Sequence, residues 1–401
     1  MDPTARTPPP LHRRRRGRHA DLRRPPGPRG RRPIARCGGR RPARLAARAA
    51  RGRRRRRSRR HRTRATARLD LTVAVQPTTG TERITDWLRA AGAERPAPVV
   101  DAATLDDLRE GLDLLARAAA ARVPDHLRPL RLTKATIDAL LRCPRAGAAR
   151  LAAADEGPRS GPLLVGALFE QVAHLIVERI VDPEADGPAG TFDRACAALA
   201  VASGEDVDHL VGDDARDLLE EQLFERVRRF RSSWRAPLHP AWWYRSEVPF
   251  EVAFGDGAAG PAAVLACRVD LSFGPTPPAL GSGGRPRLLL ELKSGRHDVA
   301  HLDDLGLYLL AAALVEGSAP VGGAVWWAAP STPAPHGVLQ TLPADAPTLQ
   351  SAAVRVGRAL EVAADVLGGR VATIPGGHCR FCPDRTVCPA AASSDEFGDA
   401  W

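Results

Sequence analysis

The chain has 401 residues, with 59 Lys or Arg against 46 Asp or Glu, and so a formal net charge of +13. This length allows one large domain or two ordinary ones, and an apolar content of 44% is enough for a sizeable core. No apolar run is long enough to cross a membrane, and no apolar segment follows the N-terminal arginines as it does in a secretory signal. We therefore expect a cytoplasmic protein without a membrane partner or a disulfide scaffold.

The positive charge is concentrated at the N-terminus. Residues 1–68 hold 27 Arg and 2 Asp, a local charge of +25, which leaves 32 Lys or Arg and 44 Asp or Glu, a charge of −12, in the rest of the chain. A segment of this composition repels itself and has little to bury, so we expect a disordered tail over residues 1–69. Two interpretations of the tail stay open: an arm that contacts phosphates, or an extension from a start codon placed too far upstream.

In the residues that follow the tail, apolar side chains recur at the spacing of an α-helix. This spacing predicts helices over residues 104–123, 133–144, 165–181 and about 210–230. In the first of them Thr104 and Asp107 are placed like a capping box, and Pro144 stops the second. We divide this part of the chain into a helical N-terminal extension over residues 70–130 and a larger domain over residues 131–401.

The period then changes to that of strands. Strands are predicted over residues 246–254 and 263–273, joined as a hairpin by a Gly-rich turn, and over residues 287–294. A helix at 300–317, a strand at 322–330, a short strand at 337–342 and a helix at 346–367 complete the pattern. The core order α-β-β-β-α-β predicts an α/β fold with a mixed central sheet flanked by helices and with helical additions.

Lysine occurs only at Lys134 and Lys293, although the chain is rich in basic residues. Glu291 and Lys293 alternate with the apolar residues of one predicted strand, and Asp270 does so in the strand before it. The apolar residues on the opposite faces are Val269, Leu271, Phe273, Leu290 and Leu292. A buried carboxylate costs several kcal/mol unless it is paired or bound to metal. Two carboxylates and an ammonium on neighbouring strands therefore predict a site for Mg²⁺ or Mn²⁺.

The alternative is a half-exposed strand that carries a simple Glu–Lys pair. The rarity of lysine favours the metal site, because an ammonium can orient or activate a water, whereas a guanidinium stays protonated and needs more room.

Val269 and Asp270 form a V-D pair, and E-L-K follows after twenty residues at positions 291–293. This pattern resembles the signature of the PD-(D/E)XK nuclease superfamily. The wider pattern resembles its RecB-like exonuclease branch, which includes CRISPR-associated and AddB-type iron–sulfur nucleases, over about residues 131–390. The resemblance implies a restriction-endonuclease-like core in which Asp270 and Glu291 bind the catalytic metal, assisted by the carbonyl of Leu292. Lys293 then positions the water that hydrolyses a phosphodiester bond.

Two further elements of that family are altered in this chain. An early helix of the family usually carries G-x-x-x-H, and "GALFE" puts Glu170 at the place of the histidine, with His174 one turn later. The resemblance makes both residues candidate metal ligands, and the alternative is a solvated polar face. The family often shows Q-x-x-x-Y after the E-x-K strand, and here Asp304 replaces the glutamine while Tyr308 is kept. Tyr308 is a candidate catalytic residue or a buried core tyrosine.

The last three cysteines, Cys379, Cys382 and Cys388, form a C-x2-C-x5-C half-site for a metal, and Cys143 in "LLRCPRA" is the candidate fourth ligand. In the iron–sulfur nucleases that the chain resembles, one cysteine before the core joins three after it, which implies a [4Fe–4S] cluster in a Cys-rich C-terminal loop. The alternative is a structural Zn²⁺ held by the three cysteines with Cys143 or His378. The remaining cysteines, Cys37, Cys196 and Cys267, are interpreted as bystanders.

The function implied by the resemblance is metal-dependent cleavage of DNA, by an exonuclease or an end-processing enzyme, in repair, recombination or defence. The alternative is a non-catalytic or accessory DNA-binding subunit of a repair complex with the same fold. The complete set of Asp270, Glu291 and Lys293 favours the enzyme, because an inactive copy is free to replace the lysine by arginine. No Walker motif occurs, so a helicase would be a partner, and we expect the protein at the nucleoid.

Overall fold

The structure is a computed structural model of the chain. It describes residues 83–94, 100–152, 162–204, 213–234, 243–257, 260–274, 287–328, 335–382 and 385–390. The Arg-rich tail predicted over residues 1–69 lies outside the described residues, so its prediction stands as it was made.

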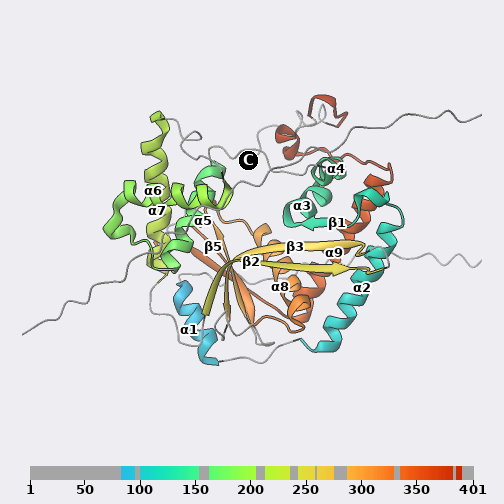
Figure 1. The fold of residues 1–401 in the computed structure, drawn as a ribbon, viewed down its shortest axis with the longest axis horizontal. Coiled ribbons are helices and arrows are strands. Elements are labelled where there is room, and N and C mark those ends of the chain that lie inside the picture. Colours follow the sequence, from blue (N-terminus) through green and yellow to red (C-terminus); the bar gives the residue numbers. More distant parts are fainter. Residues whose placement is uncertain are drawn as a thin grey trace, which may run out of the picture. The chain divides into compact units, whose positions relative to one another are not determined.

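The described strands form one mixed sheet of six strands (Figure 1). Its order is β1-β3-β4-β5-β6, with β2 paired to β3. The bounds are β1 (Leu130–Thr133), β2 (Trp243–Phe254), β3 (Ala263–Gly274), β4 (Leu288–Lys293), β5 (Gly322–Trp327) and β6 (Val338–Pro343). β1 runs parallel to β3 and β4 parallel to β5, while the other pairs are antiparallel.

The long strand β3 changes partner along one of its edges. β2 pairs with it along its whole length, from Ala263 to Gly274. On the other edge, β1 pairs with residues 263–266 and β4 with residues 271–273. β1 and β4 therefore separate at residues 267–270, which we call the fork of β3, and the fork ends at Asp270.

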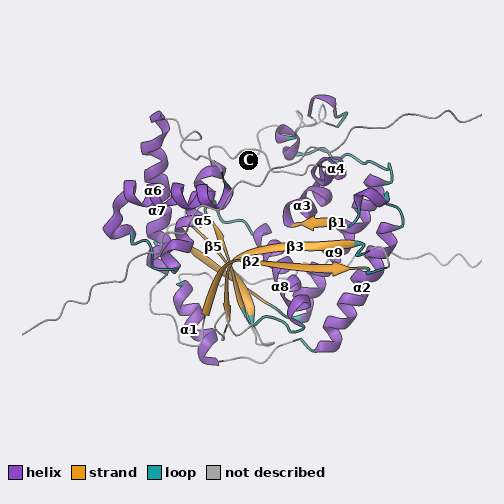
Figure 2. Ribbon diagram, viewed as in Figure 1, coloured by secondary structure: helices purple, strands orange, loops and turns teal. Residues whose placement is uncertain are grey.

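Helices cover both faces of the sheet (Figure 2). They are α1 (Ile84–Glu94), α2 (Ala102–Ala120), α3 (Lys134–Arg142), α4 (Pro144–Ala152), α5 (Pro162–Val177), α6 (Pro183–Ser203), α7 (Asp213–Ser233), α8 (Ala300–Glu316) and α9 (Ala346–Leu367). One hydrophobic cluster contains buried residues of α2, α3, α8 and α9, and a second contains those of α1, α5, α6 and α7. Successive residues of β4 alternate between the clusters, with Leu289 in the first and Leu290 in the second. Among the described residues, none of the helices is both long enough and apolar enough to cross a membrane.

The predicted α/β class and the order of helix, three strands, helix and strand are confirmed, with β6 as the additional short strand. The pattern missed β1, α1, α4 and α6. β1 has only four residues, too few to establish a period, and α6 is interrupted at Gly187, whose φ is 68°, before Pro188. The buried residues of α2 share the first cluster with those of α8 and α9, and the boundary at residue 130 stays a prediction.

The start of α2 differs from the predicted capping box. Its N-cap is Asp101, whose carboxylate accepts a hydrogen bond from the backbone N–H of Thr104 at 2.8 Å. Thr104 is therefore the recipient of the cap and lies within the first turn. An N-cap carboxylate satisfies one of the N–H groups that have no partner within the helix, and Asp101 does this as well as a threonine would.

The predicted alternation along β3 does not keep its apolar residues in one core. Val269 packs in the first cluster with Cys267, whereas Leu271 and Phe273 pack in the second. The change occurs opposite Glu247 of β2, which has a φ of 50° and interrupts the pairing between Ser246 and Val248. The positive φ of Glu247 changes the direction of β2 at this point, and the residues of β3 beside it pass from the first cluster to the second.

Aromatic side chains fix α5 to the sheet. Phe169 stacks on Trp326 of β5, with ring centroids 5.8 Å apart and an interplanar angle of 18°, and it packs edge-on against Phe230 of α7 at 6.1 Å. All three side chains are almost fully buried. This packing determines where the next residue of α5, Glu170, meets the sheet.

Truncating this aromatic contact should be costly. We expect Phe169→Ala to lower the free energy of unfolding by about 3–5 kcal/mol, because it removes buried surface and leaves a cavity beside Trp326. Leu218→Ala on α7, where the side chain is exposed, should change it by less than about 0.5 kcal/mol. Urea unfolding followed by tryptophan fluorescence measures both, and similar values for the two variants would contradict this account of the packing.

Candidate metal centre

Four acidic side chains converge at the fork of β3. They are Glu170 of α5, Glu247 of β2, Asp270 of β3 and Glu291 of β4. Ligand atoms of Glu170, Glu247 and Asp270 all lie within 4.8 Å of one another. Asp270 and Glu291 are 8% and 3% exposed, so the sheet holds these carboxylates away from bulk water.

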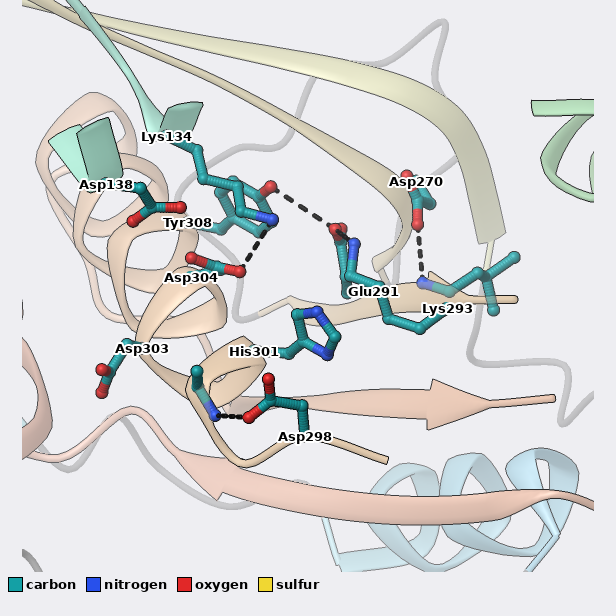
Figure 3. Close-up of polar contacts among 12 residues, drawn as sticks. Lys134, Asp138, Asp270, Glu291, Lys293, Asp298, His301, Asp303, Asp304 and Tyr308 are labelled. Carbon is teal, nitrogen blue, oxygen red and sulfur yellow. Dashed lines mark hydrogen bonds and ion pairs between the residues drawn. The ribbon is translucent and has the colours of Figure 1, made fainter. Parts of the chain in front are cut away.

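The strand register brings Asp270 and Glu291 together. Leu271 pairs with Leu290, so the next residues along the two strands, Asp270 and Glu291, are neighbours where the pairing ends. The Asp270 carboxylate accepts a hydrogen bond from the backbone N–H of Leu292 through Oδ2 at 2.6 Å (Figure 3). A side chain thus continues the contact where the strands separate, and it fixes one oxygen of Asp270.

Glu247 is the residue of this group that the sequence did not reveal. Its Oε2 accepts from Arg268 Nε at 2.6 Å, and its Oε1 lies 3.7 Å from Nδ1 of His174. The same strand carries a second acid, Glu251, which pairs with Arg131 at the surface. Alternation cannot choose between these two acids, because Glu247 owes its direction to its positive φ.

Glu170 and His174 lie on α5, one turn apart, and both are largely withdrawn from solvent. Burial, followed by repulsion from Glu247, raises the pKa of Glu170 to about 7. Burial and the charge of Arg268 lower the pKa of His174 to about 4, so its ring is neutral at pH 7. His174 Nε2 is buried, and it has no hydrogen-bond partner among the described residues. The ring is able to accept a metal, although it does not belong to the group of three carboxylates.

Lys293 and Tyr308 both contact Glu291 (Figure 3). The Lys293 ammonium donates to Glu291 Oε1, and the Tyr308 hydroxyl lies 3.5 Å from the same oxygen. Burial alone would lower the pKa of Lys293, but the attraction of Glu291 and Asp270 outweighs it and raises the pKa. Lys293 is therefore a protonated donor at neutral pH. Burial and the charge of Glu291 raise the pKa of Tyr308, which keeps its hydroxyl protonated.

The carboxylates carry more negative charge than their surroundings neutralise. The pKa values of Asp270 and Glu291 are both raised to about 7, with burial as the main cause. Repulsion from Glu170 adds to the shift of Asp270, and repulsion from Asp270 adds to that of Glu291. Oε2 of Glu291 and Oε1 of Glu247 are buried without hydrogen-bond partners among the described residues. Oxygen ligands that lack partners and share excess charge suit a hard divalent cation such as Mg²⁺ or Mn²⁺. The residues at this position fit such an ion.

A comparison with protein families matches residues 131–389 to the PD-(D/E)XK nuclease superfamily, which is more than half of the chain. The chain belongs to this superfamily. A comparison with curated proteins gives no match. The resemblance carried by Asp270, Glu291 and Lys293 is thus confirmed at the level of the superfamily, and the mixed sheet between helices is consistent with its restriction-endonuclease-like fold. The match does not extend to the RecB-like branch, which stays a prediction.

The cysteines proposed to hold a cluster do not belong to the acidic group of this PD-(D/E)XK domain. Cys143 follows α3 and Cys379 lies in the short helix Gly377–Phe381, and both are buried, while Cys382 and Cys388 are half-buried. Among the described residues, no three of these thiols lie within 4.8 Å of one another. The backbone N–H of Arg145 donates to the carbonyl of Ala372 at 3.2 Å, which joins the start of α4 to the segment before Cys379.

The raised pKa values predict how stability depends on pH and metal. The folded protein holds the protons of Asp270 and Glu291 more tightly than the unfolded chain does. The stability that these protons provide is fully present below about pH 4 and is lost as the pH rises through about 7. Because Mn²⁺ competes with the same protons, Mn²⁺ should raise the Tm more at about pH 8 than at about pH 5.5. At a hundredfold excess over its Kd, it should add about 2.7 kcal/mol.

Thermal denaturation of the wild type, Asp270→Asn and Asp365→Asn with and without Mn²⁺ checks this. Asp365 pairs with Arg122 and Arg370 at the surface, so its variant should keep the full response to Mn²⁺. Asp270→Asn should lose most of the response and should flatten the metal-free pH dependence. An equal response in both variants would place the ion elsewhere.

Proposed function

We propose that this protein is a metal-dependent DNA nuclease of the RecB-like branch, an exonuclease or end-processing enzyme that acts in repair, recombination or defence. The observation that carries the proposal is the convergence of Glu170, Glu247 and Asp270 beside the ion pair of Lys293 and Glu291. Acids that share excess charge next to a protonated lysine suit the hydrolysis of an anionic ester, because metal and ammonium each stabilise negative charge.

Each residue has a distinct part in this proposal. Asp270 and Glu291 hold Mg²⁺ or Mn²⁺, with Glu170, Glu247 and the neutral ring of His174 completing the ligands. The bound ion polarises the phosphate and lowers the pKa of water. Lys293 donates hydrogen bonds that orient the attacking water, since its raised pKa keeps it from acting as the base. Tyr308 donates to Glu291 and so restricts the direction of that carboxylate.

We propose DNA as the substrate, and the charge of the chain is consistent with a polyanion. The body is acidic, with a charge of −12, while residues 1–68 carry +25. Non-specific affinity for a polyanion would thus come from the arginines, and the acidic centre would select a phosphate only through its metal. A helicase or another subunit of a repair complex is the partner we propose, in the cytoplasm at the nucleoid.

The proposal is tested by incubating the full-length protein with end-labelled single- and double-stranded DNA in Mn²⁺, in Mg²⁺ and in EDTA. We expect cleavage with either metal and none in EDTA. Tight DNA binding without cleavage in either metal would instead support the accessory DNA-binding subunit.

Variants at Lys293 separate catalysis from binding. Lys293→Ala should lower the rate of cleavage by about 10²–10⁴-fold, since it removes a donor that acts on the attacking water. Lys293→Arg should fail similarly, because the larger planar guanidinium cannot take the place of an ammonium beside Glu291. Arg89→Ala, at an exposed pair with Asp86, should keep the wild-type rate. Single-turnover rates measure this, and an unchanged rate for Lys293→Ala would overturn the assignment.

We further propose that Cys143, Cys379, Cys382 and Cys388 hold a [4Fe–4S] cluster, with a structural Zn²⁺ as the alternative. Support comes from the spacing of the last three cysteines, the burial of Cys143 and Cys379, and the backbone contact between Arg145 and Ala372. A cluster shared across this distance in the sequence would close a long loop, and its binding energy would become folding energy.

Anaerobically purified protein should then be brown and hold about four irons per chain. Cys143→Ser should remove the colour and lower the Tm as much as Cys382→Ser does. Cys267→Ser should do neither, because that buried thiol lies in β3. Metal analysis that finds one zinc per chain would replace the cluster with a zinc site. Full iron content in Cys143→Ser would exclude this residue as the fourth ligand.

A further inference from the structure

Both lysines of the chain lie at the candidate metal centre, although only Lys293 belongs to the E-x-K strand. Lys134 is the first residue of α3, far from Lys293 in the sequence. Arginine fills the other basic positions of the chain. A lysine differs from an arginine in being a compact point charge with three rotatable donors. The position of Lys134 therefore calls for a function of its own.

Lys134 is held by a buried carboxylate. Its Nζ lies 2.8 Å from Oδ2 of Asp304 in α8 (Figure 3). The Asp304 side chain is only 4% exposed, while that of Lys134 keeps 29% of its surface exposed. Arg355 of α9 approaches the other oxygen of Asp304 at 3.7 Å. Asp304 thus has a second cation, Arg355, nearby. Asp304 also holds the Lys134 ammonium in a place that solvent or a ligand can still reach.

The ammonium stands on the same side of α8 as the metal centre. Asp304 and Tyr308 are one turn apart on α8, and the Tyr308 hydroxyl lies 3.5 Å from Oε1 of Glu291. In Figure 3, Lys134 and Tyr308 both point toward the region of Glu291. Burial raises the pKa of Glu291, and Lys134 is one of the two cations, with Lys293, that oppose this shift. The charge of Lys134 is therefore felt at the metal centre.

An ammonium at this place cannot be a metal ligand, because it repels a cation and has no lone pair while protonated. It becomes useful when an anion arrives with the metal. Among the described residues, Asp304 is the acceptor found for Lys134, which leaves two of its three N–H donors for a ligand. Once a divalent ion has neutralised the carboxylates, Lys134 and Lys293 add positive charge on two sides of Glu291.

We propose that Lys134 binds a backbone phosphate of the DNA strand next to the phosphate held at the metal centre, and that Asp304 holds the ammonium in position. The inference rests on the proposed function and adds a contact to it. The ligand atom is a non-bridging oxygen of a phosphodiester. Lys134 is thus a substrate-binding residue and Asp304 is a positioning residue.

Single-turnover cleavage of a labelled duplex by the full-length protein in Mn²⁺, at several salt concentrations, gives two quantities. These are the enzyme concentration at half-maximal rate and the rate at saturation. Lys134→Gln should raise the half-maximal concentration about tenfold and reduce its logarithmic salt slope by about one, as expected when one phosphate contact is lost. The saturating rate should change much less. Lys134→Arg should retain most of the binding and the salt slope, since the charge is kept.

The double variant Lys134→Gln/Asp304→Asn shows whether Lys134 contacts phosphate or serves only as the counter-ion of Asp304. Removing both charges does not leave the buried carboxylate of Asp304 without its lysine, so the double variant should fold even where Lys134→Gln alone is unstable. If Lys134 binds phosphate, the double variant stays about tenfold weaker with the reduced slope. If Lys134 serves only to neutralise Asp304, the double variant regains the wild-type half-maximal concentration and slope, and the proposal is wrong.

Arg131→Gln is the matched control, because it removes one cation from β1, three residues from Lys134, where the side chain is exposed and pairs with Glu251. Arg131→Gln should keep the wild-type salt slope. A change in slope equal to that of Lys134→Gln would show that the loss of any nearby positive charge causes the effect, and it would contradict a specific contact of Lys134 with phosphate. If the wild type does not cleave DNA, the proposed function fails. The contact is then tested by equilibrium binding of the same variants to the same duplex in Ca²⁺, where an unchanged slope for Lys134→Gln would overturn it.

Discussion

The repulsion among four carboxylates at the fork of β3, of which Asp270 and Glu291 are buried, is the constraint on which the site depends. Arg268 pairs with Glu247 and Lys293 pairs with Glu291, so two cations face four acids among the described residues in direct contact. The excess of two negative charges equals the charge of one divalent ion, and without it the pKa values of Asp270 and Glu291 rise to about 7. A divalent ion bound here would therefore complete the electrostatic balance and let these side chains be ionised together.

The backbone contributes to the same balance. Glu247 keeps a positive φ that costs on the order of 1–3 kcal/mol, and this strain persists because β2 and β3 are paired on both sides of it. Its effect is to aim an acid at the fork, while the neighbouring stretch of β3 turns from one hydrophobic cluster to the other. The N–H of Leu292 fixes Asp270 from the opposite strand. The fork thus directs two carboxylates by main-chain geometry, and side-chain packing such as that of Phe169 on Trp326 sets the approach of Glu170.

What the sequence predicted follows from period and register. Two strands with alternating charge placed Asp270, Glu291 and Lys293 together, and the helical period located α5, α8 and α9, because those signals are local and repeated. Glu247 escaped prediction because its direction depends on one dihedral angle, and β1 did so because four residues carry no period. The wrong N-cap of α2 has a similar cause, since several short polar residues compete at a helix start and only geometry selects among them. The branch of the superfamily and the cysteine ligands depend on contacts between distant segments, and they stay predictions.

The charges around α8 extend the argument beyond the E-x-K strand. Most of this helix is buried and apolar, and Asp304 is the charged residue within its buried stretch. An ion pair buried in such a place is often no more stabilising than apolar side chains of the same volume, so stability alone does not explain Asp304 with Lys134 and Arg355. Arg355 also pairs with Asp138 of α3, and this network ties α3, α8 and α9 together behind Tyr308. Its cost is explained if the most exposed member, Lys134, is held ready for the backbone phosphate next to the one at the metal centre.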